Sequence, residues 1–409
     1  MFILKITVTP LFLRAFIHYL FIGLCTLTPC FAMAALAPSA EISGFARFIG
    51  GYLDTDGAKY QGYDDALSAS QASLIGIQTD IALTPGLSVS GQLLMHSSAD
   101  RDSGVEWLYM RYSPNENWQF KVGRLRTPVL RYSDVIDVGF AYPWISAPQQ
   151  LYSGYLFSHY EGASARYRTR VGQVGINLEG YYGQYKDDIN ASDASYSANV
   201  EGLYGGIVDV MYGRLQLRFA SLFAPDSDTD NAQIDPLRDA MLQAGFSRNA
   251  KVLDFKGDVD LYLMGANYET LDWFGAAEWM KINSKLEVLS TSTNYYVMVG
   301  RYFGDVQLHL TYANSRNTRK TIENEIPIGL SAQLDQLALA FDQVIGALPQ
   351  DDLSTYTVGV RWDARPNVAV KLEWSHLRGD ANKASYFTHI QPGFDRQANL
   401  LQMGVEWVF

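Results

Sequence analysis

Arginine and lysine side chains at alternate positions are the residues of this sequence best suited to chemistry. Arg166 and Arg168 continue the two-residue spacing of Tyr160, Gly162 and Ser164. In an extended strand, residues two apart point to the same face. If that face lines a water-filled space, the guanidinium groups create a field that favours anionic groups on a solute.

Other charged residues on polar faces extend this basic wall. The expected lining residues, beside Arg166 and Arg168, are Lys121, Arg111, Arg47, Arg218 and Arg361, with Asp134 and Asp137 on a long segment nearby. Acids on further polar faces would oppose these cations: Asp80, Glu179, Glu278, Glu373 and Glu406. The alternative is that the arginines pair with Asp134 and Asp137, or fill the space as neutralised groups.

Enzymatic and metal-binding chemistry has little support. None of the six histidines stands at metal-ligand spacing from another. Ser375 and His376 are adjacent, so in a strand they face opposite sides and cannot form a catalytic pair. The acidic run Asp226–Asp230 lacks the glycine and distal glutamate of a calcium-binding loop. We therefore expect no catalysis, no metal and no cofactor.

The composition is unlike that of an ordinary soluble enzyme. Of 409 residues, 18% are charged, below the roughly 25% of soluble domains. The chain holds 26 tyrosines and 34 glycines, and its formal net charge is -11. An acidic chain is a poor partner for nucleic acid. Beyond the N-terminus, no apolar run reaches the ~18 residues that a membrane-spanning helix needs.

The N-terminus has the features of a secretory signal peptide. Residues 1–34 contain an apolar stretch, no acids, and the sequence Ala32-Met33-Ala34 at their end. Signal peptidase requires small residues at the first and third positions before the cleaved bond. We expect cleavage near Ala34, with an uncleaved anchor as the alternative. Cys25 and Cys30 would leave with this segment, so residues 35–409 could form no disulfide.

Apolar and polar residues alternate along most of the remaining chain. Val368, Val370, Leu372 and Trp374, for example, are separated by Ala369, Lys371 and Glu373. This period of two is the pattern of a strand with one apolar and one wet face. About sixteen such strands are expected, at 42–53, 73–84, 87–97, 104–113, 118–124, 159–170, 173–184, 198–211, 214–224, 256–268, 273–282, 292–303, 305–315, 353–363, 367–378 and 398–409.

Short and long connections between these segments alternate. Pro85-Gly86 and Val171-Gly172 are tight turns, whereas 125–158 and 316–352 are long loops. Antiparallel strands with tight turns at one end and long loops at the other form an up-and-down barrel. The predicted fold class is therefore all-β, a transmembrane antiparallel β-barrel. Its apolar face would meet lipid and its polar face a water-filled lumen, with a soluble sandwich as the alternative.

Two further patterns refine this barrel. Interfacial girdles are expected from aromatic residues near strand ends, namely Trp118, Tyr212, Trp273, Tyr302, Trp362 and Trp407. Short helices are expected in two long loops. One begins at Asp235-Pro236 and stops at Gly245, and the other covers Gln333–Leu348 with apolar residues at helical spacing. We expect these helices to pack on the barrel rim or on each other.

With these features the mature chain resembles the sixteen-stranded, trimeric porins of Gram-negative bacteria. The resemblance rests on the strand count, the alternation of connections and the terminal sequence Gly404–Phe409. It also rests on Val122-Gly123-Arg124 and Glu161–Arg168, which flank the third long loop. It implies that this loop, about 125–158, folds into the barrel. It also implies that Trp407 and Phe409 form the signal read by the barrel-assembly machinery.

The resemblance implies a location in the bacterial outer membrane, in contact with lipid and lipopolysaccharide, as a homotrimer. The loop at 125–158 is rich in proline and aromatic residues and lacks the acid-rich consensus of general porins. This departure favours a substrate-selective channel over a general-diffusion constriction. We expect a passive, water-filled channel for small hydrophilic solutes, with a modest preference for anions set by Arg166, Arg168 and Lys121. Two alternatives stay open: a channel selective for small anionic solutes, and a plugged structural or adhesive barrel.

Overall fold

The computed structural model describes residues 39–98, 101–153, 157–191, 194–230, 234–286, 288–348 and 350–409. The signal segment expected at 1–34, with its cleavage site near Ala34, lies outside these residues.

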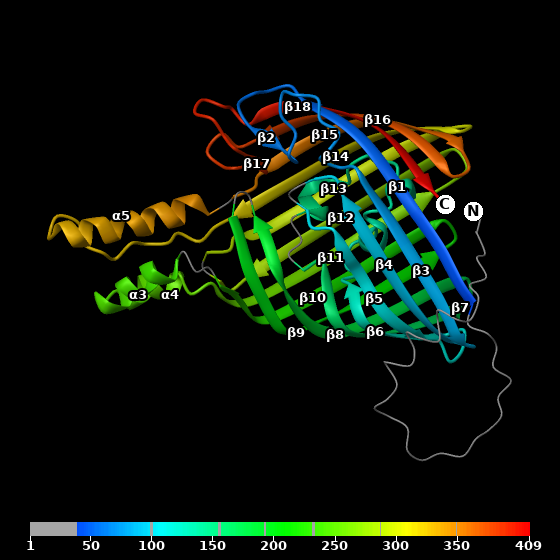
Figure 1. Cartoon of the computed structure of the whole chain (residues 1–409), viewed down its shortest axis with the longest axis horizontal. Coiled ribbons are helices and arrows are strands. Elements are labelled where there is room, and N and C mark those ends of the chain that lie inside the picture. The colour runs from blue at the N-terminus through cyan, green and yellow to red at the C-terminus, as the bar shows by residue number, and fades with distance from the viewer. Residues whose placement is uncertain are drawn as a thin grey trace, which may run out of the picture.

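Sixteen antiparallel strands close into a barrel (Figure 1), which confirms the predicted fold class. Each strand pairs with its neighbour in the chain, and the first pairs with the last. The strands are β1 (Ser39–Leu53), β3 (Leu74–Thr84), β4 (Leu87–His96), β5 (Gly104–Tyr112), β6 (Trp118–Arg126), β7 (His159–Val171), β8 (Val174–Ala191), β9 (Ala194–Tyr212), β10 (Leu215–Asp230), β11 (Lys256–Glu269), β12 (Trp273–Ser284), β13 (Thr291–Phe303), β14 (Val306–Thr318), β15 (Leu353–Arg365), β16 (Val368–Gly379) and β18 (Gln397–Val408).

Most strand ends fall within a few residues of the predicted ones, but one hairpin is much longer. Residues 185–191 and 194–197, predicted as part of a loop, continue the β8–β9 ladder, with Asp187 opposite Ala198 and Ala191 opposite Ala194. Tyr185 is buried, but Lys186 and Asp187 after it are exposed and charged, so the sequence shows no sustained apolar alternation here.

The long loops carry the helices. α3 (Asp235–Gln243) and α5 (Ala332–Ala347) match the two predicted helices, and they contact each other beyond the barrel end (Figure 1). Other elements were not predicted, among them α4 (Ser247–Val252), which packs on α3, and a small sheet of β2 (Lys59–Tyr60) and β17 (Phe387–Thr388). None of the helices in the described residues is long and apolar enough to cross a membrane.

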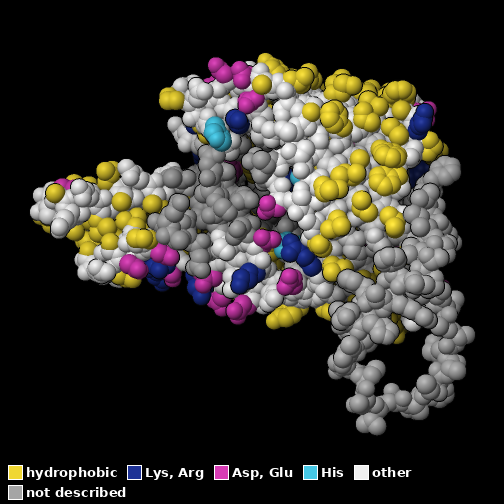
Figure 2. Space-filling model, viewed as in Figure 1, with side chains coloured by type: hydrophobic (Ala, Val, Ile, Leu, Met, Phe, Trp, Pro, Cys, Tyr) yellow, Lys and Arg dark blue, Asp and Glu magenta, His cyan; other side chains and the backbone are white. Residues whose placement is uncertain are grey.

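The outer face of the barrel is apolar. Large side chains such as Phe48, Leu310 and Met403 are exposed there, and Figure 2 shows hydrophobic groups spread over this surface. All but one of the expected girdle residues are exposed. Tyr302 is the exception, because it is half-buried and its hydroxyl donates to Glu269.

The inner face differs from the expected polar wall. On β9–β13 many of its residues are buried and apolar, including Ile207, Leu222, Leu261, Met280 and Met298, although Asp209, Arg218 and Glu278 share this face. The apolar residues form one cluster with Val129, Leu130, Tyr142, Trp144 and Leu151 of the third loop. The third loop therefore packs on this part of the wall through a hydrophobic core, and where it does so both faces of the strands are apolar.

Candidate functional site

The third loop, described over 125–153 and 157–158, lies against lumen-facing residues of β1, β10, β12, β14–β16 and β18. It contains the short helices η1 (Ser133–Val135), η2 (Gly139–Ala141) and α2 (Gln149–Tyr152). Four cations of the wall donate to its backbone carbonyls: Arg47 on β1, Arg218 on β10, Arg361 on β15 and Lys371 on β16. A loop carbonyl has no ladder partner, so a wall cation satisfies it where water is excluded.

Lys371 is the most completely enclosed of these cations. Its Nζ donates to the carbonyls of Gly139 at 2.8 Å, Tyr142 at 2.8 Å and Trp144 at 2.7 Å. It also forms an ion pair of 2.5 Å with Glu406 Oε2, and the lysine side chain is 1% exposed. Arg47 pairs with the other oxygen of Glu406 at 3.1 Å. These contacts bind η2 and the residues after it to β1, β16 and β18.

Wall acids hold the loop through its donors. Glu278 on β12 accepts the backbone N–H of Arg131 at 2.9 Å and the hydroxyl of Tyr152 at 2.6 Å. Glu373 on β16 accepts the backbone N–H of Ile145 at 2.9 Å. The loop is therefore fixed through both its donors and its acceptors.

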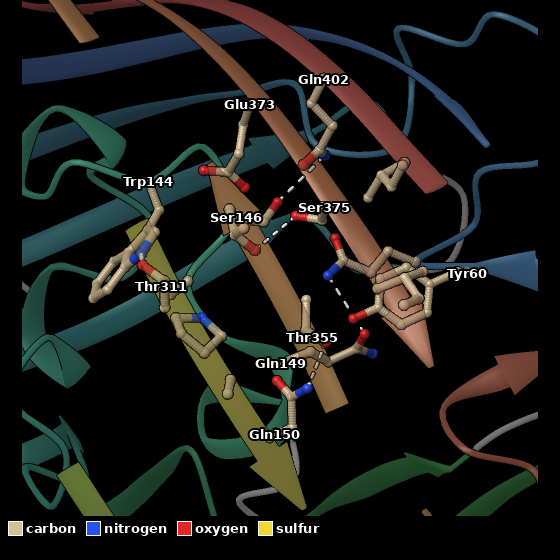
Figure 3. Close-up of a pocket in the computed structure, with 17 residues that line it drawn as sticks. Tyr60, Trp144, Ser146, Gln149, Gln150, Thr311, Thr355, Glu373, Ser375 and Gln402 are labelled. Carbon is tan, nitrogen blue, oxygen red and sulfur yellow. Dashed lines mark hydrogen bonds between the residues drawn. The ribbon is translucent and has the colours of Figure 1, made fainter. Parts of the chain in front are cut away.

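A seam of hydroxyl and amide groups closes the gap between the loop and β14–β16 (Figure 3). Trp144 Nε1 donates to Thr311 at 2.8 Å, and Gln150 donates to Thr355 at 2.6 Å. The space left here is about 20 Å³, enough for roughly one water molecule. Side chains of the loop and of these strands therefore fill nearly all the space between them.

The start of the loop is tied to β5 and β6 by a buried ionic group. Arg126 pairs with Glu106 at 2.5 Å and with Asp137, which also accepts from Arg101 at 3.2 Å. Burial alone would raise the pKa of Asp137, but the charges of Arg126 and Arg101 outweigh it and lower that pKa to about 2. Asp137 therefore stays ionised, and the tie persists, at any pH above about 4.

Two larger cavities lie on the other side of the loop, against β5–β12. The turn-side cavity has a volume of about 520 Å³, and Arg131, Arg168, Arg170, Arg218, Asp209 and Glu278 are its charged lining residues. The loop-side cavity has a volume of about 170 Å³, and its lining includes Trp107, Tyr109, Lys121, Asp134 and Glu179. Arg166 on β7 and Glu179 on β8 form an ion pair of 2.5 Å near the middle of these two strands.

The expected lining residues thus fall into three groups. Arg47, Arg218 and Arg361 contact the third loop, and Arg218 also pairs with Asp209 at 3.0 Å. Arg166 and Asp137 are in ion pairs, and Arg111 donates to Ser88 at 3.1 Å. Arg168, Lys121 and Asp134 line the cavities, and their side chains make no hydrogen bond or ion pair with any described residue.

Sequence reasoning did not select Arg126 or Arg131. It placed Lys371 on a polar strand face, as it did Arg47, Arg218 and Arg361, but did not predict its partners, which are backbone carbonyls that no residue type reveals. Arg126 and Arg131 follow the predicted end of a strand, where the period of two no longer says which way a side chain points.

The C-terminal residue completes the sheet. The N–H of Phe409 donates to the carbonyl of Gly44 at 2.9 Å, and the N–H of Gly44 donates back at 2.8 Å. A Cβ at Gly44 would lie 2.5 Å from the Phe409 ring, so only glycine leaves room for it. The ring also packs against Trp407, with centroids 4.6 Å apart.

Comparison with known proteins agrees on the fold. No family model matches the chain, and no curated protein matches it. Among solved structures, OmpF of Salmonella typhi in complex with daunomycin superposes with a TM-score of 0.57 at 14% identity, covering 91% of this chain and 98% of that one. The anion-selective porin of Comamonas acidovorans gives 0.56 at 16% identity, covering 91% and 100%. The outer membrane channel DcaP of Acinetobacter baumannii gives 0.55 at 12% identity, covering 94% and 100%. The chain therefore has the sixteen-stranded porin fold.

Proposed function

We propose that this protein is an outer-membrane porin, a passive and water-filled channel for small hydrophilic solutes. The observation that carries the proposal is the uneven attachment of the third loop. The loop is tied to β12–β16, β18 and β1 by buried polar contacts and packs on apolar residues of β9–β13, while two cavities remain beside it, one of about 170 Å³ lined from β5–β8 and one of about 520 Å³ lined from β7–β12. A solute then passes between the loop and the wall at these two cavities.

The charges along this route favour anions. The turn-side cavity is lined by four arginines and two carboxylates. Asp209 is neutralised by Arg218, and Glu278 accepts two hydrogen bonds from the loop. Arg131, Arg168 and Arg170 then dominate the field at a narrow point, where salt screens less than it does over exposed loops.

The proposal includes the protein's maturation and surroundings. Residues 1–34 direct export and are removed near Ala34, and the barrel then sits in lipid and lipopolysaccharide. A homotrimer is in line with OmpT of Vibrio cholerae, described in a trimer form, which superposes with a TM-score of 0.50 at 13% identity. Crosslinking in native membranes should give trimers, and a yield of monomers alone would contradict that state.

The purified protein should produce discrete conductance steps in a planar lipid bilayer, because an open aqueous route carries ions through each inserted barrel. Liposomes that contain it should swell in small sugars. A denatured sample is the control for leakage. A folded, inserted barrel that gives no conductance would favour the plugged alternative.

We further propose that Phe409 and Trp407 form the assembly signal. Replacing Phe409 by Asp should leave the protein degraded or aggregated in the periplasm, because the charged group cannot occupy the place of the ring beside Gly44 and Trp407. Immunoblots of outer-membrane fractions measure this, with Phe303→Asp, at an exposed strand end, as the matched control. Equal membrane levels of the Phe409 variant and wild type would contradict the assignment.

A further inference from the structure

The loop-side cavity brings together two charges of opposite sign from separate elements. Lys121 projects from β6 on the wall, and Asp134 lies in η1 on the third loop. Neither has an ion pair or a side-chain hydrogen bond among the described residues. The other charged groups of the lining are occupied, since Glu179 pairs with Arg166, and Arg126 pairs with Glu106 and Asp137. One cation and one anion are thus left for a solute.

The remaining lining is aromatic and holds an unsatisfied donor. Trp107, Tyr109 and Tyr160 all face the cavity. The ammonium of Lys121 lies 5.1 Å from the centroid of the Tyr109 ring. Trp107 Nε1 is shielded from solvent and has no hydrogen-bond partner among the described residues. Buried donors are normally paired, so a small rotation of this ring would let a bound molecule supply the missing acceptor.

The charges define the class of solute. A simple anion would be attracted by Lys121 but repelled by Asp134. A simple cation would be attracted by Asp134 but repelled by Lys121. A neutral solute would displace water from both charges and replace it at neither. A zwitterion places a carboxylate on Lys121 and Trp107 and an ammonium on Asp134 and the aromatic faces.

The volume of the loop-side cavity limits the size of the solute. The cavity of about 170 Å³ is similar to the roughly 150 Å³ cavity that binds benzene, so it suits about six to ten non-hydrogen atoms. Resting on the proposed channel function, we propose that the loop-side cavity is a binding subsite for small zwitterions of the α-amino acid type. Lys121 holds the carboxylate and Asp134 the ammonium.

Four solutes of nearly equal size test the subsite in liposomes that contain the whole protein. They are alanine, lactate, alaninamide and lactamide, which differ in whether they carry the ammonium, the carboxylate, both or neither. Initial uptake of alanine at low concentration should exceed that of lactamide by roughly fivefold, the effect of one well-placed ion pair, and should saturate as alanine increases.

Single substitutions separate the two charges. Lys121→Met should make alanine and alaninamide equal, and Asp134→Asn should make alanine and lactate equal. The exchange Lys121→Asp/Asp134→Lys keeps both charges and should retain the preference for alanine. The control Lys285→Met/Asp258→Asn removes a pair at the strand ends, outside both cavities, and should behave as wild type.

The outcomes distinguish the subsite from the channel. If all four solutes enter at one rate, or if lactate enters as fast as alanine in wild type, the zwitterion subsite is wrong and the channel stands. If an inserted, folded protein admits none of the four, the proposed channel function itself is wrong.

Discussion

Replacing Lys371 by Met will raise the single-channel conductance and make the current levels fluctuate more. The ammonium of Lys371 satisfies three loop carbonyls and Glu406 in a place with 1% exposure. Methionine keeps the length of the side chain but removes every donor and leaves Glu406 one cation fewer. Breaking a buried ion pair costs about 3–5 kcal/mol, so the middle of the third loop should detach from β16 and move between positions.

The measurement is single-channel recording, in which the variant should show larger and noisier current levels. Lys383→Met is the matched control, because Lys383 pairs with Asp352 at 2.6 Å in the outer loops, away from the third loop. Deletion of Asp134–Gln149 should mark the upper limit of conductance. Gel migration with and without heating shows whether each variant is folded. A folded Lys371 variant with wild-type current levels would contradict the role of this lysine.

Removing Arg131 and Arg168, two of the three arginines of the turn-side cavity that form no ion pair with a described residue, should abolish the anion preference. Wild type should be modestly anion-selective despite its net charge of -11. In Arg131→Gln/Arg168→Gln, the carboxylates Asp209 and Glu278 face only Arg170 and Arg218. The local field then loses its excess of positive charge.

Zero-current potentials across a KCl gradient measure this change and should shift toward cation selectivity. The control Arg214→Gln/Arg365→Gln removes the same charge from exposed residues at the short turns and should leave the potential near wild type. Equal shifts in the two double variants would mean that overall charge, and not this cavity, sets the preference.

The barrel could be predicted because its signal is local and repeated. Alternation along Val368–His376 and tight turns such as Val171-Gly172 each specify one strand or one hairpin, and consecutive hairpins can only close on themselves. The longer β8–β9 hairpin was missed because the residues after Tyr185 are mostly polar and show no apolar alternation. The small β2–β17 sheet was missed because it joins residues from opposite ends of the chain.

At the site, only the types of the lining residues could be predicted from the sequence, and not their contacts. The period of two placed Arg47, Arg361 and Arg166 on lumen faces, but it could not show which would be used by the loop and which by acids. Those contacts join residues far apart in sequence, such as Arg361 with Phe140. The apolar inner wall of β11 was also unexpected, because Leu261 and Tyr262 are both apolar and hide the alternation.

Accessibility of single cysteines tests most directly on which side of the third loop solutes pass. Once residues 1–34 are removed the chain has no cysteine, so introduced thiols are unique. Asn267→Cys places one in the turn-side cavity, and Thr357→Cys places one on the sealed seam. A water-soluble methanethiosulfonate reagent, added during recording in a planar bilayer, should reduce the current quickly in the Asn267 variant and leave the Thr357 variant unchanged. Rapid block of the Thr357 variant, with none in the Asn267 variant, would mean that solutes pass between the loop and β14–β16. That result would contradict the proposed route.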